Sequence, residues 1–258
     1  MKRNFLASLP IAFIAIILNF VYKAWAAQII DQETLGRFFT LIDGISFVMM
    51  IFIGFRSSMI ASYAKYGDEK MILSVFALFI AIIGTLLSLI TWIGLENKKD
   101  AIFIIVMILS FSLYIYLSNQ LSVYKLYALM NHLTFWEPVL LLAVFAIAST
   151  YFHLTGFSLL ACATILSTLS LALLAGIGKL KYYGMTSWVK ITFDEKTREF
   201  VIHSLMAALE FLAGMALVYL AVVILLLEGN FVAIAAFHVV TKSFLMYAIM
   251  LCIFPMFK

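Results

Sequence analysis

Four charged side chains lie inside long apolar stretches of the sequence, where an ionisable group is available for chemistry. They are Lys23, Asp43, Glu210 and Lys242. An ionisable group at membrane depth costs about 2.5–3.5 kcal/mol on insertion scales, so such a group is by default a candidate for a functional site. The two lysines can meet an anionic ligand as point charges, or pair with the two carboxylates when no ligand is bound. The competing interpretation is purely structural pairing, with Lys23 extending to the outer membrane interface.

Three further polar residues join this set of candidates: Asn19, Arg56 and His238. Asn19 lies one helical turn before Lys23 and shares its face, and His238 has the same relation to Lys242. Arg56 lies near the predicted cytoplasmic end of a helix, where a contact with phosphate competes with the role of a positively charged anchor. Polar side chains within spans also hold neighbouring helices together, so each candidate retains a structural alternative.

The sequence contains no pattern typical of a metal site or of common catalytic centres. No two of the four histidines are spaced three or four residues apart, and both cysteines lie in apolar runs. A phosphate-binding Walker loop, an HExxH motif and a GxSxG motif are all absent. We therefore expect no metal, no cofactor and no enzymatic activity. A membrane enzyme acting on lipid carriers remains an alternative, which the short loops disfavour.

The composition of the chain predicts an all-α polytopic membrane protein. Of its 258 residues, 66% are hydrophobic and 12% are charged, whereas soluble domains have about 45–50% apolar and about 25% charged residues. A spanning helix needs about 20 apolar residues, and about eight segments meet this requirement. They are approximately Phe5–Ala27, Leu35–Ala61, Met71–Gly94, Ala101–Tyr124, Phe135–Phe152, Phe157–Leu180, Phe200–Leu227 and Phe231–Phe257.

The boundary between the fourth and fifth segments is placed by its polar residues. We expect a turn near Asn131–Thr134, which puts Pro138 in the first turn of the fifth helix, where its missing N–H costs nothing. Glu137 would then lie at the amino-terminal end of that helix, where the helix dipole stabilises a carboxylate.

The charges of the loops predict the orientation in the membrane. With the amino terminus inside, twelve lysines and arginines fall on the cytoplasmic side and three on the outer side. Because cytoplasmic loops are enriched in positive charge, both termini are predicted to be cytoplasmic. Lys2-Arg3, the following apolar run and Ala24-Trp25-Ala26 also match a cleavable secretory signal, but Lys23 and Trp25 crowd the cleavage region. We expect this segment to be retained as the first helix.

One basic segment, Lys179–Glu199, divides the chain. We predict a six-helix lobe at 1–180, a cytoplasmic linker at 181–199 and two helices of an incomplete second lobe at 200–258. The last two helices look like a faint repeat of the first two, because aligning 237–255 on 39–57 matches apolar positions throughout. Internal repeats of this kind are common in transporters.

The stretch Ala27–Lys70 carries a more specific pattern. A short acidic loop leads into Leu35-Gly36-Arg37-Phe38-Phe39, Gly54 lies near the end of the next helix, and the cytoplasmic loop Tyr63–Asp68 follows. This pattern resembles the amino-terminal part of the polysaccharide-biosynthesis flippases, members of the multidrug/oligosaccharidyl-lipid/polysaccharide exporter superfamily. The basic linker is similar to the connection between the two halves of those proteins.

The resemblance implies a transporter that translocates polyprenyl-pyrophosphate-linked oligosaccharide across a bacterial inner membrane, with the charged candidates lining a central cavity. Its implied partners are the lipid-linked glycan and membrane lipids, with no role for nucleic acid. Family members usually build two complete lobes, so the resemblance also implies either a short member or a second chain, or second copy, that completes the lobe. The alternatives are a cation-coupled multidrug exporter of the same superfamily and a non-transporting scaffold in glycan assembly.

Overall fold

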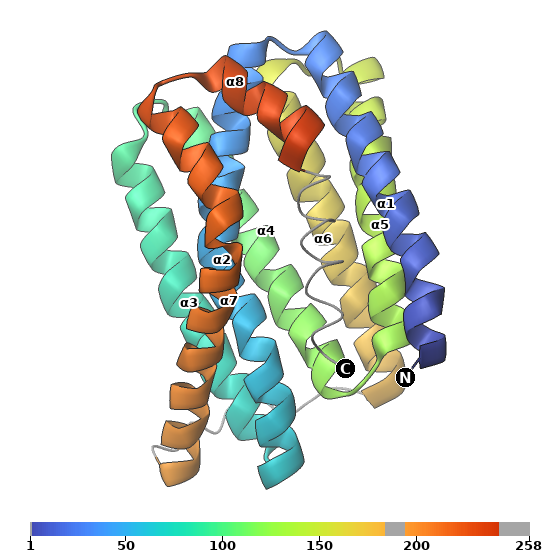
Figure 1. The fold of residues 1–258 in the computed structure, drawn as a ribbon, viewed down its shortest axis with the longest axis vertical. Coiled ribbons are helices and arrows are strands. Elements are labelled where there is room, and N and C mark those ends of the chain that lie inside the picture. The colour runs from blue at the N-terminus through green and yellow to red at the C-terminus, as the bar shows by residue number, and fades with distance from the viewer. Residues whose placement is uncertain (1, 184–193, 243–258) are drawn as a thin grey trace. The chain divides into compact units, whose positions relative to one another are not determined.

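The computed structural model of the chain describes residues 2–183 and 194–242 (Figure 1). This part of the chain is helical and contains no strand. Its helices are α1 (Lys2–Ile29), α2 (Gln32–Tyr66), α3 (Glu69–Gly94), α4 (Lys98–Val123), α5 (Tyr127–Thr150), α6 (Gly156–Tyr183), α7 (Glu195–Leu227), α8 (Phe231–Ala236) and the π-helical turn η1 (Phe237–Lys242).

The prediction of a multi-pass membrane protein is confirmed, whereas the count of eight spans is not. Among the described residues, α2 to α6 are each long and apolar enough to cross a membrane. In α7, Glu195–Gly214 and Tyr219–Leu227 make a sixth span if they are taken together. The first and eighth predicted spans are represented by shorter apolar helices at Phe13–Ile29 and Phe231–Thr241. The rest of the eighth prediction, 243–257, lies outside the described residues.

Short polar side chains begin several of these helices. Asp31 accepts a hydrogen bond from the Thr34 backbone N–H at 2.8 Å, and Asp194 accepts one from Thr197 at 2.9 Å. Each bond satisfies an N–H that has no partner within the helix. These bonds stabilise the ionised carboxylates, so the pKa of Asp31 and that of Asp194 lie below the usual range.

The predicted turn at Asn131–Thr134 is wrong. Helix α4 ends at Val123, and Lys125 adopts the left-handed conformation with φ 58°, a common way for a helix to end. Helix α5 begins at Tyr127 and continues through the polar residues to Thr150, because isolated Asn, His and Thr side chains lower helix propensity without breaking a helix.

The positions expected for Pro138 and Glu137 are therefore also wrong. Pro138 lies inside α5, where its missing N–H removes one hydrogen bond to the preceding turn. Glu137 is exposed and lies far beyond the first turn of α5. The helix dipole acts within the first turn, so it does not explain this carboxylate.

Contacts divide the chain into two compact units, which are described separately. Unit 1 consists of Met1–Gly44, Thr134–Thr164 and Met215–Lys258, and unit 2 consists of Ile45–Leu133 and Ile165–Gly214. The predicted division at a linker stays a prediction. Part of that linker is helical, since α6 continues to Tyr183 and α7 begins at Glu195, and 184–193 lies outside the described residues.

The core of unit 1 is aromatic. Phe145 on α5 meets Tyr22 and Trp25 on α1 edge to face, with ring centroids 5.2 and 5.5 Å apart. Such geometry is favourable beyond the area that it buries. Gly36 on α2 lies against the backbone of Phe231, where no Cβ would fit, so a glycine permits the close approach of α2 and α8.

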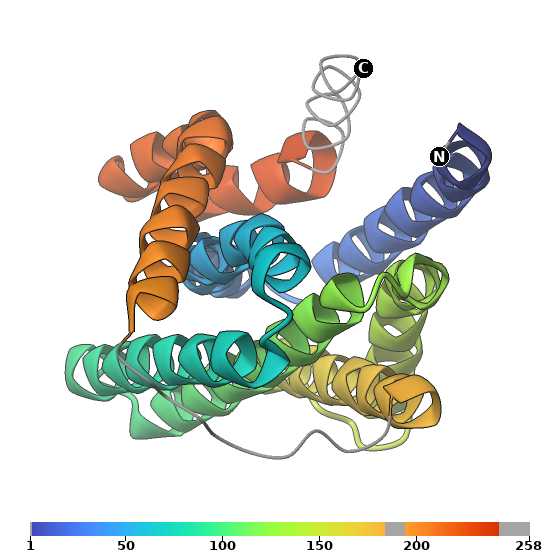
Figure 2. The same ribbon diagram turned by 90° about the horizontal axis from the view of Figure 1, so that it is seen from below.

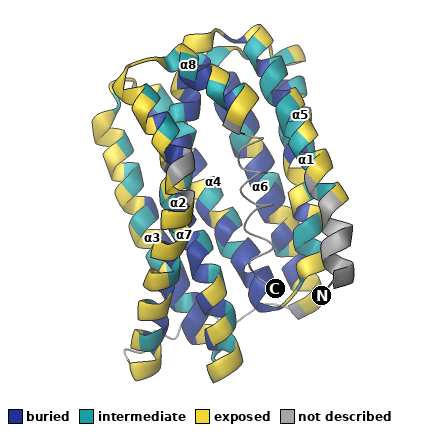
Figure 3. Cartoon of the chain, viewed as in Figure 1, coloured by how far each residue is buried: buried dark blue, intermediate teal, exposed yellow. Residues whose placement is uncertain are grey.

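Unit 2 contains the antiparallel neighbours α3 and α4, which lie side by side in two views (Figures 1 and 2). Its core includes Phe52, Phe55 and Phe76, all fully buried. Exposed residues of α3 are yellow in Figure 3. On the face opposite the core they are apolar and include Ile82, Leu86, Leu89 and Ile93. An exposed apolar face of this length is what a helix in contact with lipid requires.

Candidate functional site

Lys23 and Asp43, two charged candidates of unit 1, lie at a buried carboxylate–imidazole pair. Asp43 on α2 is 4% exposed and His238 on η1 is 3% exposed. The Nε2 atom of His238 lies 2.7 Å from Oδ2 of Asp43. Burial of a polar group is costly without a hydrogen bond, and this bond offsets part of that cost. It also gives the imidazole a fixed direction toward the carboxylate.

Two more residues complete this arrangement, named here the Asp43 cluster: Lys23, Phe39, Asp43 and His238. The Phe39 ring stacks on the His238 ring with centroids 4.5 Å apart and an interplanar angle of 12°. Lys23 on α1 donates a hydrogen bond from Nζ to the backbone carbonyl of His238 at 3.2 Å. Its Nζ also lies 5.9 Å from the centroid of the Phe39 ring, within the range of a cation–π interaction.

The Asp43 cluster thus joins three of the candidates predicted from the sequence, and it draws on three elements of unit 1. The π-helical turn that carries His238 is itself notable, because π-helical turns are rare and are frequent at functional sites. Chemically, the pair can hold a proton on either the imidazole or the carboxylate, and Lys23 adds a positive charge close by.

Arg56 belongs to unit 2, where its guanidinium is half-buried on α2. Its Nε donates to Oδ1 of Asn119 at 2.9 Å, and the Nδ2 of Asn119 donates to the Phe52 carbonyl at 2.7 Å. Asn119 is fully buried, so it fixes the direction of the guanidinium. Arg56 forms no ion pair with any described residue, which leaves its outer nitrogens available to an anion.

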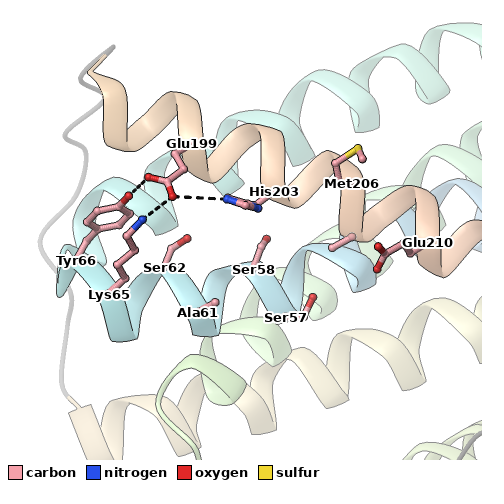
Figure 4. Close-up of a pocket in the computed structure, with 11 residues that line it drawn as sticks. Ser57, Ser58, Ala61, Ser62, Lys65, Tyr66, Glu199, His203, Met206 and Glu210 are labelled. Atoms are coloured by element: carbon pink, nitrogen blue, oxygen red, sulfur yellow. Dashed lines mark hydrogen bonds and ion pairs between the residues drawn. The ribbon is translucent and has the colours of Figure 1, made fainter. Parts of the chain in front are cut away.

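Glu210 lines a pocket of about 480 Å³ between α2 and α7 of unit 2 (Figure 4). The two helices are held together beside it by the Ser58 and Ser204 hydroxyls, 2.5 Å apart. Gly54 allows the contact, since a Cβ at this position would lie 2.5 Å from the Cα of Ala208.

The other end of this pocket holds a second group of charges, named here the Glu199 cluster: Lys65, Tyr66, Glu199 and His203. The Nζ of Lys65 lies 2.5 Å from Oε1 of Glu199, and the Tyr66 hydroxyl donates to Oε2. His203 Nε2 lies 3.6 Å from Oε1 of the same carboxylate. The dashed lines of Figure 4 mark these three contacts.

Two candidates remain, Asn19 and Lys242. Asn19 is half-buried on α1 and forms no hydrogen bond with the described residues. Lys242 ends η1, and its side chain lies outside the described part of the structure. Glu210 and Asp43 fall in different units. A single cavity that collects all the charged candidates stays a prediction.

Sequence reasoning missed Phe39, Asn119 and the Glu199 cluster as site residues. Phe39 was visible only as part of the pattern that enters the second helix. Lys65 and Glu199 lie at the ends of two predicted spans, where basic and acidic residues are ordinary. Asn119 had a usable signal, because it is a polar side chain within a predicted span.

The described residues contain no group of three or more His, Cys, Asp or Glu side chains that could hold a metal ion. What the two units offer instead is a buried titratable pair beside a lysine, a half-buried arginine and an open polar pocket. Comparison with known proteins adds no assignment: no protein-family model, curated protein or solved structure matches this chain.

Proposed function

We propose that this protein is a flippase-like transporter that moves polyprenyl-pyrophosphate-linked oligosaccharide across a bacterial inner membrane for surface polysaccharide synthesis. The proposal is supported by the apolar spans, by the resemblance of Ala27–Lys70 to that family, and by ionisable groups buried within the spans. Both termini are proposed to be cytoplasmic, on the evidence of the loop charges.

The observation that carries the proposal is the Asp43–His238 pair, buried at 4% and 3% exposure with one member inside a spanning helix. Burying such a pair in a membrane costs free energy, and two apolar side chains would pack equally well in its place. A transporter, in contrast, needs helix contacts that change with ligand or proton. The pair joins α2 to η1, so a change in its charge alters that contact directly.

Arg56 supplies a group of the kind that a lipid pyrophosphate requires. Arginine binds phosphate through two parallel N–H groups, and Asn119 occupies only Nε. We assign Arg56 to the phosphate of the substrate and the Asp43 cluster to the conformational change.

A second candidate function is a cation-coupled exporter of the same superfamily. The specific observation in its favour is again the Asp43–His238 pair, because a carboxylate and an imidazole that share a hydrogen bond can bind and release a coupling proton. The two functions differ in substrate. A flippase changes the pool of lipid-linked glycan, whereas a drug exporter changes resistance to cationic drugs.

The test uses cells that lack the protein and carry plasmid-borne variants, with polyprenyl-linked glycan in the membrane and polysaccharide at the surface as readouts. We expect the intermediate to accumulate and the surface product to fall in the deletion strain. Arg56→Gln and Asp43→Asn should fail to restore transport, while Glu96→Gln, at an exposed loop position, should restore it. An unchanged lipid pool in the deletion strain refutes the flippase, and drug-susceptibility assays on the same strains test the exporter.

A further inference from the structure

The Glu210 end of the pocket in unit 2 presents only hydrogen-bond acceptors. Glu210 is exposed and has neither an ion pair nor a hydrogen bond with any described residue. Ser57 lines the same pocket, and its hydroxyl donates to the Gly54 carbonyl at 3.2 Å. Because that proton is already used, the Ser57 oxygen is left to accept a hydrogen bond. Figure 4 draws both side chains at the end of the pocket remote from Lys65.

The Glu199 end is electrically balanced. Lys65 and Glu199 neutralise each other at 2.5 Å, and the second oxygen of Glu199 accepts from Tyr66. Apart from His203, the charged side chains that line the pocket sum to the single negative charge of Glu210. An anionic ligand such as a pyrophosphate would therefore be repelled, which separates this pocket from the phosphate contact proposed for Arg56.

Between the two polar ends, the walls combine apolar side chains with the hydroxyls of Ser58 and Ser62. Ala61 on α2 faces the pocket, as do Met206 and Ala207 on α7. Methionine is flexible and adapts to the shape of a bound hydrocarbon. A volume of about 480 Å³ falls within the range of about 300–1,000 Å³ typical of small-molecule sites.

We propose that this pocket binds a small organic cation of the primary alkylammonium class, with the ammonium group on Glu210 and Ser57 and the alkyl chain along Ala61, Met206 and Ala207. A primary ammonium supplies three N–H donors to an end of the pocket that offers only acceptors. Its charge matches that of Glu210, the carboxylate in the lining of this pocket that no described residue pairs. The site goes beyond the proposed function, since the glycan substrate is anionic and this ligand is cationic.

The experiment titrates hexylammonium chloride into the purified full chain in neutral maltoside micelles at neutral pH, with heat release as the readout and empty micelles as the blank. We expect saturable binding to the native chain. Glu210→Gln should weaken it by about tenfold or more, because the ammonium loses its ionised partner and keeps only a neutral amide oxygen as acceptor. Ser57→Ala should weaken it less, and Glu96→Gln should bind as the native chain does.

Hexanol and hexanoate, which have the same chain length, separate charge recognition from partitioning into the micelle. Neither should bind saturably. Equal binding of hexanol, or unchanged binding to both Glu210→Gln and Ser57→Ala, overturns the proposal. Circular dichroism and gel filtration show whether Glu210→Gln folds. If it does not, the Ser57→Ala variant and the hexanol and hexanoate probes decide the question.

Discussion

The Asp43 cluster and the Glu199 cluster are built from the same three chemical groups, a carboxylate, an imidazole and a lysine, in opposite environments. Asp43 and His238 are almost wholly buried, whereas the side chains of Lys65 and Glu199 are 58% and 37% exposed. Water screens the exposed group and competes for its hydrogen bonds. The buried group has no such competitor. Removing the same chemical group is therefore expected to lower stability strongly in the Asp43 cluster and only slightly in the Glu199 cluster.

Removing the imidazole from each cluster should give the largest difference in stability between the two clusters. His238→Ala should lower the free energy of unfolding by about 2–4 kcal/mol, because it deletes a buried hydrogen bond to Asp43 and leaves a cavity beneath the Phe39 ring. His203→Ala removes an exposed ring and should leave stability nearly unchanged. Unfolding in mixed micelles, followed by circular dichroism, measures both. Equal losses would mean that burial does not distinguish the clusters.

The second test concerns the packing that holds the pocket beside the Glu199 cluster. Gly54→Ala places a Cβ 2.5 Å from the Cα of Ala208, so α7 must move away from α2 at a cost of about 1–3 kcal/mol. The matched control is Gly44→Ala on the same helix, where nothing lies within 4 Å of the new Cβ.

Gly44→Ala should be neutral or stabilising by about 0.5–1 kcal/mol, because alanine is the better helix former. The same unfolding assay applies. A loss at Gly44 as large as that at Gly54 would show that the close α2–α7 contact is not the cause.

A smaller effect is expected when the charge of the exposed cluster is removed. Glu199→Gln keeps the hydrogen-bonding shape but loses the ion pair with Lys65. The resulting destabilisation should be slight at low salt and should vanish as salt screens the native pair. Melting temperatures of the native chain and the variant, measured across a salt series, test this. A difference that persists at high salt contradicts the assignment of an exposed, screened pair.

The sequence predicts the class of the protein and some site residues, but not which residues meet in the fold. Composition alone predicts the membrane class, and the cost of charge in a membrane singles out Lys23 and Asp43 without any structure. The Asp43–His238 pair could not be predicted as a contact, because the two residues are 195 positions apart and apolar helices give no signal of which faces meet. The pairing of Arg56 with Asn119 was hidden for the same reason.

The boundary between α4 and α5 was missed for a local reason. Lys125 carries the left-handed conformation there, a position for which glycine or asparagine is the usual signal. The polar residues from Asn131 onward were a stronger sequence signal, yet they lie within α5. The boundary after α4 is thus marked by one backbone conformation, whereas the interior of α5 tolerates scattered polar side chains.

The smallest expected effect lies outside both clusters, at the start of α2. Asp31 caps this helix through the Thr34 N–H, and that bond keeps the pKa of Asp31 below its unfolded value. The stability that the ionised cap provides is therefore complete above the unfolded pKa, near pH 4, and is lost as the pH falls through the folded pKa. Asp31→Asn keeps an oxygen for the Thr34 N–H but cannot titrate. The pH profile of its melting temperature should be slightly flatter than the native profile at the acid end, while the two profiles run parallel above about pH 5. Identical profiles throughout would show that this exposed cap is too weakly coupled to folding to be measured, unlike the buried carboxylate of Asp43.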